Sequence, residues 1–315
     1  MEEIKSNTLD EAKEKPTKDK VTKPKFTGEA DILTRATVGD ARIYVARTTR
    51  LVRKLSLRHN LSHLATAALG RTVTGALLLA ATMKNEEGVG IKVTGDGPIG
   101  GITGEAQGGT ARGYVGNPDV YLPPKNGHLD VGGAVGSGTI SVTRYTANAK
   151  PFTGTAELVD GEIADDLTKY LYISEQTPSS VGLGVLVDEK GDVQAAGGWF
   201  IQALPNCSEE TLDQLDKNVS KTPYVSSLID MGFTPEQIIC MLGKGMKAEI
   251  LDSYPLHFGC RCSRERVEAV LRTLPKKELN QLAEDEKTEI TCPYCNAKYE
   301  FSREEMKHLA QKAKK

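Results

Sequence analysis

The residues best suited to do chemistry are four cysteines near the end of the 315-residue chain, arranged as two close pairs. One residue separates Cys260 from Cys262, and Cys292 and Cys295 follow further along the chain, in Cys-Pro-Tyr-Cys. Two separated pairs of thiolates can close a tetrahedron around one Zn²⁺, which accepts four sulfur ligands readily. The spacing therefore predicts one zinc site with these four ligands. His257 could replace one of them, although a partly buried surface histidine is the favoured interpretation of that residue.

The same four cysteines could also be redox-active. A disulfide within Cys-Arg-Cys would close a small strained ring, which makes it labile. Arg261, Arg264 and Arg266 around the first pair, and Lys298 after the second, would stabilise the thiolates that oxidants attack. The hypothesis is that oxidation forms two disulfides, ejects zinc and unfolds this part of the chain. A purely structural zinc ribbon remains an alternative, because spacing alone does not exclude it.

Other catalytic motifs are weak. Cys-Pro-Tyr-Cys is also the active-site motif of glutaredoxins, but there it belongs near the start of a βαβ unit, and here it lies close to the chain end. Gly95–Gly100 matches a dinucleotide fingerprint, but the residues after it lack a helical pattern, so a β-turn is predicted. His59 and His63 lack an HExxH context and are expected to face solvent. No Walker A or GxSxG motif is present, and a non-enzymatic protein is predicted.

The charge balance does not favour nucleic acid as a partner. The chain has 40 basic and 42 acidic side chains, a net charge of −2, and the segment 253–315 interleaves basic with acidic side chains. Tyr294, Tyr299 and Phe301 could stack on bases, but beside the cysteines they are expected to cover the metal site. A constitutive zinc-ribbon binding module for nucleic acid or one fixed protein partner is kept as the alternative function.

Targeting and membrane signals are also weak. Residues 1–29 contain seven Lys and seven Asp or Glu and almost no apolar side chains, which predicts a disordered charged tail rather than a signal peptide. Leu64–Met83 is apolar but contains Arg71, and its uninterrupted part is too short for a bilayer, so a buried helix is expected. We therefore expect a soluble, cytoplasmic protein with no membrane partner and with reduced thiols.

Residues 30–202 are expected to form an α+β core domain, because strand and helix patterns are mixed there. Val-, Ile-, Thr- and Gly-rich runs over 88–122 predict an antiparallel meander. The other expected strands cover 32–44, 139–143, 154–158 and 192–199, and the expected helices cover 48–59, 62–83, 162–174 and 178–186.

Two further units are expected after the core. Residues 203–252 form a helical linker of short, moderately apolar helices, with Ser208 as one N-cap and a capping box at Thr234–Gln237. Residues 253–315 form a zinc-binding redox-switch domain, where the metal compensates for a small core. Its helices are expected over 263–274, over 276–285 and after the capping box at Ser302–Glu305.

With these features together, the sequence closely resembles the heat shock protein 33 family of redox-regulated holdase chaperones. The Cys-x-Cys and Cys-x-x-Cys pairs carry the resemblance together with stretches of the core, over about residues 30–310. These stretches are RATVGDARIYVARTT, TAALGRT, GDGPIGG, GYVGNP, SEQTPSSVGLGVLVD and AAGGWFIQALP.

The resemblance implies one zinc ion on Cys260, Cys262, Cys292 and Cys295 in a reduced, inactive form. It also implies that oxidation pairs neighbours, as Cys260–Cys262 and Cys292–Cys295, releases zinc and unfolds the linker. The oxidised protein would then hold unfolding client proteins without ATP, often as a homodimer.

Client contacts are expected from apolar linker residues that unfolding would free. The candidates are Ile238, Ile239, Met241 and Leu242. The charged tail and the two further cysteines, Cys207 and Cys240, depart from the family pattern, and either thiol could form mixed disulfides.

Overall fold

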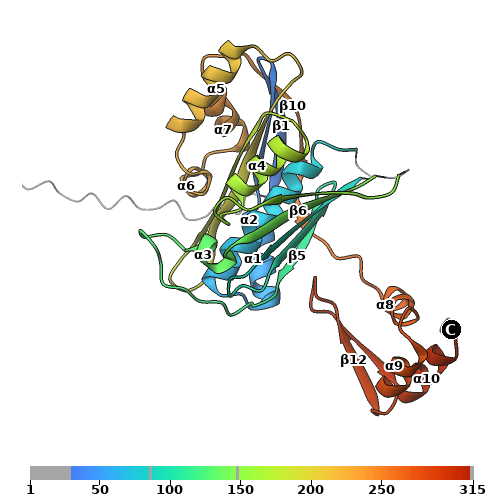
Figure 1. Ribbon diagram of the computed structural model, residues 1–315. Coiled ribbons are helices and arrows are strands. Elements are labelled where there is room, and N and C mark those ends of the chain that lie inside the picture. The colour runs from blue at the N-terminus through green and yellow to red at the C-terminus, as the bar shows by residue number, and fades with distance from the viewer. Residues whose placement is uncertain (1–29, 85–86, 147–148, 313–315) are drawn as a thin grey trace, which may run out of the picture.

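Two sheets with one long helix between them form the core of the molecule (Figure 1). The computed structural model describes residues 30–84, 87–146 and 149–312, and the expected charged tail over 1–29 lies outside the described residues. Antiparallel pairing dominates both sheets and helices pack on their faces, so the expected α+β class is confirmed.

The first sheet has five antiparallel strands in the order β10-β1-β2-β9-β8. The strand expected over 32–44 is a hairpin instead, because Gly39, with a φ of +52°, turns the chain between β1 and β2. The segment 178–186, expected to be helical, is strand β8. Gly182 lets β8 approach the Trp199 ring, which would lie 2.3 Å from a Cβ at that position. The strands are β1 (Ile32–Val38), β2 (Ala41–Arg47), β8 (Ser179–Val187), β9 (Val193–Ala203) and β10 (Ala248–Pro255).

The second sheet has six strands in the order β11-β5-β4-β3-β6-β7. Consecutive strands β3, β4 and β5 pair antiparallel, which confirms the expected meander. The dinucleotide-like Gly95–Gly100 lies in the turn between β3 and β4, with no helix after it, so the β-turn prediction is confirmed. The strands are β3 (Gly88–Gly95), β4 (Ile102–Gln107), β5 (Thr110–Val115), β6 (Gly138–Tyr145), β7 (Phe152–Glu157) and the short parallel β11 (His257–Phe258).

Helix α2 (His63–Ala80) contacts both sheets and is buried on almost every side. In the described part of the chain, α2 is the one helix that is long and apolar enough to cross a membrane, and 89% of it is buried inside the protein. The remaining core helices are α1 (Thr49–His59), α3 (Val131–Val135) and α4 (Ala164–Ser174).

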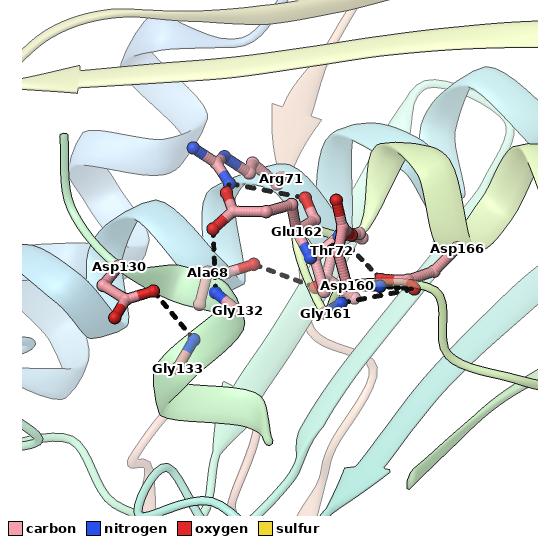
Figure 2. Close-up of polar contacts among 11 residues, drawn as sticks. Ala68, Arg71, Thr72, Asp130, Gly132, Gly133, Asp160, Gly161, Glu162 and Asp166 are labelled. Atoms are coloured by element: carbon pink, nitrogen blue, oxygen red, sulfur yellow. Dashed lines mark hydrogen bonds and ion pairs between the residues drawn. The ribbon is translucent and has the colours of Figure 1, made fainter. Parts of the chain in front are cut away.

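Arg71, which lies in the middle of α2, is accommodated by a polar network at the start of α4 (Figure 2). Its guanidinium pairs with the Glu162 carboxylate, whose other oxygen accepts a hydrogen bond of 2.9 Å from the Gly132 amide. The buried Asp166 carboxylate accepts backbone N–H groups of the same loop, including that of Ile163 at 2.9 Å. Glu162 thus pairs with a charge that would be costly if left unpaired inside an apolar core.

The region after β9 packs on the outer face of the first sheet. Helices α6 and α7 contact strands of this sheet, and α5 contacts α7. The expected caps are present: Ser208 accepts a bond from the Thr211 amide, and Thr234 and Gln237 form a capping box. Strand β10 was not expected; it pairs with β1 and crosses the boundary proposed at residue 252. The helices are α5 (Glu209–Lys221), α6 (Val225–Asp230) and α7 (Pro235–Leu242).

The last part of the chain forms a small unit beside the second sheet (Figure 1). A two-stranded hairpin and three short helices enclose a cluster that includes Leu279, Phe301 and Met306, each almost fully buried. Ser302 and Glu305 form the expected capping box at the start of the last helix. The elements are α8 (Arg264–Leu271), α9 (Lys276–Leu282), β12 (Lys287–Thr291), β13 (Lys298–Ser302) and α10 (Arg303–Lys312).

Candidate metal centre

The structure brings the four cysteines of the two pairs together. The Sγ atoms of Cys260 and Cys292 are 3.8 Å apart, those of Cys262 and Cys295 are 3.3 Å apart, and all four lie within 4.8 Å of one another. Zn–S bonds of about 2.3 Å place tetrahedral ligands about 3.8 Å from each other. Four sulfur donors at this spacing therefore suit one soft or borderline metal ion.

A helix cap and a hairpin turn position the sulfurs. Cys260 and Cys262 lie between β11 and α8, where Ser263 caps the helix by accepting a bond from the Arg266 amide. Cys292 and Cys295 lie in the turn of the β12–β13 hairpin, in which the Cys292 carbonyl accepts the Asn296 amide at 2.9 Å. Asn296 has a φ of +54°, a left-handed conformation that asparagine tolerates. Each pair is thus held by a local backbone motif.

The pKa values of three of the thiols are shifted, and not in the same direction. Burial raises the pKa of Cys292, and it raises the pKa of Cys295 to about 12. Burial also opposes ionisation of Cys260, but the Cys262 amide and nearby side chains, Arg112 among them, lower the pKa of Cys260 to about 7. Clustered thiolates repel each other, so four of them need a compensating positive charge. A divalent cation supplies that charge, and the donor set therefore fits a metal centre.

The positive charge beside the sulfurs comes from an unexpected place. Arg264 and Lys298, which were expected to stabilise the thiolates, pair with the carboxylates of Glu305 and Glu289. Instead, Nη1 of Arg112, in strand β5 of the core, lies 3.7 Å from the Cys260 sulfur. The sequence did not reveal this contact, because Arg112 is far from Cys260 along the chain and becomes adjacent only when the C-terminal unit docks on the core.

The other expected neighbours are arranged as follows. Tyr299 donates its hydroxyl to the Cys262 sulfur over 3.1 Å, as expected for a residue that covers the site. Phe301 lies in the apolar cluster of the unit instead, and Tyr294 extends to Glu105 of the core. His257 is exposed and its Nε2 lies 2.9 Å from the Thr110 hydroxyl, outside the thiol cluster.

His59 was expected to face solvent, but it lies at the contact between core and C-terminal unit. Its Nε2 is 3.2 Å from the Tyr294 carbonyl, and burial lowers its pKa. The guanidinium of Arg58 donates to the Cys295 carbonyl at 3.1 Å, and the side chain of Asn296 donates to the Arg58 carbonyl at 2.7 Å. The end of α1 therefore holds the turn that carries the second cysteine pair.

The proposed client residues and the two remaining cysteines lie elsewhere. Cys207 is half-buried before α5, and Cys240 is exposed on α7. The four candidate client residues belong to or pack on the cluster between the first sheet and the helices over it, and three of them are fully buried. They are Ile238, Ile239, Met241 and Leu242, of which Met241 is the half-buried one.

Fold and site together define a protein with a four-cysteine cluster, suited to a metal ion, on a small C-terminal unit docked against an α+β core. The family model described as Hsp33 protein matches residues 31–302. This chain belongs to the Hsp33 family.

Its relatives cover nearly the whole chain. The 33 kDa chaperonin of Desulforamulus reducens is 45% identical over 288 residues, which make up 90% of this chain and 98% of the relative. The 33 kDa chaperonin of Bacillus subtilis is 43% identical over 275 residues, covering 86% of this chain and 94% of the relative. Among solved structures, the 33 kDa chaperonin of Thermotoga maritima superposes with a TM-score of 0.84 at 33% identity, covering 90% of this chain and 98% of that one.

Proposed function

We propose that this protein is a redox-regulated, ATP-independent holdase chaperone rather than an enzyme. The observation that carries the proposal is the cluster of four thiols on a unit with a small apolar core. Membership of the Hsp33 family supports it, because the relatives are named chaperonins.

In the reduced form, Cys260, Cys262, Cys292 and Cys295 hold one Zn²⁺ as thiolates. Zinc bound to such a cluster supplies about 10–16 kcal/mol of folding free energy in small zinc peptides. Since the C-terminal unit buries few large side chains of its own, its fold depends on the metal. Reduced thiols also fit the cytoplasm as the place of action.

Oxidation removes the ligands. Each pair of thiolates gives up two electrons to the oxidant and forms a disulfide, Cys260–Cys262 in one pair and Cys292–Cys295 in the other. With peroxide as oxidant, each disulfide consumes one peroxide, which is reduced to water with two protons. Disulfide sulfurs are poor ligands, so the four cysteines would no longer hold Zn²⁺, and the unit would lose the folding free energy that metal binding supplies.

Unfolding of the C-terminal unit would then destabilise the linker. Cys260 lies shortly after the end of β10, an edge strand whose partner in the first sheet is β1. Unfolding of the metal unit frees one end of this strand, and the helices beside it follow. The four candidate client residues, together with the sheet face beneath them, would then bind unfolding clients; they are Ile238, Ile239, Met241 and Leu242.

Client proteins are therefore the proposed partners, with a homodimer as the proposed oxidised form and with neither nucleic acid nor membrane as a partner. Against a nucleic-acid module stands the burial of Phe301 and the engagement of Tyr294 with the core, which leave neither ring free to stack on a base. A constitutive module would also bind equally well when reduced.

Aggregation of a thermally unfolding client, followed by light scattering, tests the proposal. Three samples are compared: reduced protein, peroxide-treated protein, and peroxide-treated protein to which reductant has been added back. Suppression that appears only after oxidation supports the proposal. Equal suppression by both forms favours the constitutive module and contradicts the switch.

A further inference from the structure

The outer face of strands β4 and β5 carries a group of side chains on which the C-terminal unit with the four cysteines, called here the metal unit, docks. Glu105 lies directly opposite Arg112 in the register of the two strands, and their side chains pair with Nη2–Oε2 and Nε–Oε2 distances of 2.6 and 2.9 Å. Tyr114 follows Arg112 by two positions and therefore points to the same face.

The side chain of Tyr294, inside Cys-Pro-Tyr-Cys, packs against this group of side chains. The Arg112 guanidinium carbon lies 4.0 Å from the centre of its ring, and the Tyr114 ring meets it edge-on at 5.1 Å. Its hydroxyl donates to the free carboxylate oxygen of Glu105 over 2.5 Å. Tyr294 of the metal unit therefore contacts both the Glu105–Arg112 ion pair and the Tyr114 ring of the core.

The same guanidinium also reaches the other cysteine pair. Arg112 Nη1 lies 3.7 Å from the Cys260 sulfur, so one planar group contacts Glu105, Tyr294 and a metal-ligand sulfur at once. Only a guanidinium offers the fork of donors and the flat face that this arrangement uses.

We propose that Glu105, Arg112 and Tyr294 form a clamp that holds the reduced metal centre on the core and slows its loss of metal, with Arg112 as a positioning residue. Donation to a thiolate sulfur withdraws charge from it and lowers its nucleophilicity toward oxidants. When Cys260 becomes part of a disulfide, its sulfur is neutral and that charge-assisted contact is lost. Of the clamp contacts, only those made by Tyr294 then remain, so oxidation itself promotes undocking of the metal unit from the core.

The first test compares Arg112→Gln with Arg261→Gln in otherwise wild-type, zinc-loaded protein. The control removes an equal charge between the two cysteines of the first pair, from a side chain that is exposed. Release of zinc from the reduced protein to an excess of a chromogenic chelator is followed by absorbance. Loss of such an outer contact changes metal affinity by about tenfold or more, so Arg112→Gln should release zinc about tenfold faster. Equal rates for Arg112→Gln and wild type would overturn the clamp.

A second readout separates positioning from general loosening. In Co²⁺-loaded protein, removing a donor from a thiolate shifts the sulfur-to-cobalt charge-transfer absorption to lower energy. Arg112→Gln should show this shift and Arg261→Gln should not. Amide exchange should also quicken at 292–296 and at 105–114 in Arg112→Gln, on both sides of the contact. An unshifted band with unchanged exchange would overturn the proposal.

A double-variant comparison tests whether the parts act together. Glu105→Gln and Tyr294→Phe each weaken the same clamp, so the double variant should release zinc no faster than the faster single variant. Multiplication of the two effects would show that they are independent and would overturn the proposal.

The consequence for activation rests on the proposed function, but these readouts do not. They are measured on reduced, metal-loaded protein before any chaperone assay. A confirmed clamp with no oxidant-dependent suppression of aggregation would therefore reject the function alone, and a working switch with unchanged zinc release in Arg112→Gln would reject the clamp alone.

Discussion

Replacing Ile239 by alanine should loosen the linker helices from the first sheet while leaving the rest of the core intact. Ile239 lies on α7, is fully buried, and belongs to the apolar cluster that joins these helices to β1, β2 and β9. Cutting a buried isoleucine back to alanine costs about 2–5 kcal/mol, because the transfer free energy is lost and a cavity remains. Taking about 3 kcal/mol, the population of the opened linker should rise about a hundredfold.

Native-state amide exchange is the direct assay. In Ile239→Ala the amides of α5–α7 should exchange about a hundredfold faster, while those of β3, β4 and β6 keep their wild-type rates. Met231→Ala is the matched control, because Met231 is 56% exposed at the end of α6 and its loss should leave exchange unchanged. Equal acceleration in the linker and in the second sheet, or no acceleration in α7, would refute the view that the linker opens as a separate unit.

Three further predictions concern clients, metal and pH. Ile238→Ser combined with Ile239→Ser should weaken suppression of aggregation by the oxidised form in a dose-response assay, and an unchanged dose response would count against these residues as client contacts. Cys292→Ser removes one of four ligands, so zinc content should fall and the C-terminal unit should lose its amide protection while the core keeps its own; a variant that retains both would contradict the metal-dependent fold. Burial raises the pKa of Asp31 to about 6, against the backbone N–H donors of Arg50 and Leu51, from a usual value of 3.8. The charged carboxylate is therefore disfavoured in the folded state, and Asp31 makes the free energy of unfolding fall as pH rises from about 4 to above 6. Urea denaturation at about pH 4.5 and about pH 7 should show wild type losing stability relative to Asp31→Asn; a constant difference would refute the assignment.

The sequence was most informative where one residue type or one periodicity decides the structure. The four cysteines could be grouped from spacing alone, and the capping boxes at Thr234 and Ser302 marked the starts of real helices. These signals are local, because a cap or a knuckle is built from residues within a few positions of one another.

Strand β10 and strand β8 show where that approach fails. Residues 248–255 are mostly exposed and lack alternation, so the strand exists through its backbone pairing with β1, which no local pattern reveals. The segment of β8 was predicted as a helix, but its backbone pairs with β9, and Gly182 leaves room there for the Trp199 ring. Both cases are tertiary contacts overriding weak local preference.

The contact between metal centre and core was missed for the same reason. Arg261, Arg264 and Arg266 are close to the cysteines in sequence, but it is Arg112 whose guanidinium reaches a sulfur. Glu105 and Arg112 lie in the stretch predicted as an antiparallel meander, but only the structure shows that they face each other and that the C-terminal unit docks on them.

The central claim is that loss of metal, formation of disulfides and onset of chaperone activity are one event. It is tested most directly by titrating a single reduced sample with peroxide and measuring released zinc, free thiols and suppression of aggregation at every point. Of the six thiols, four should disappear as zinc is released, with Cys207 and Cys240 remaining, and suppression should appear in step with them after mild heating. Full suppression before zinc is lost, or zinc retained after the four thiols are oxidised, would contradict the account.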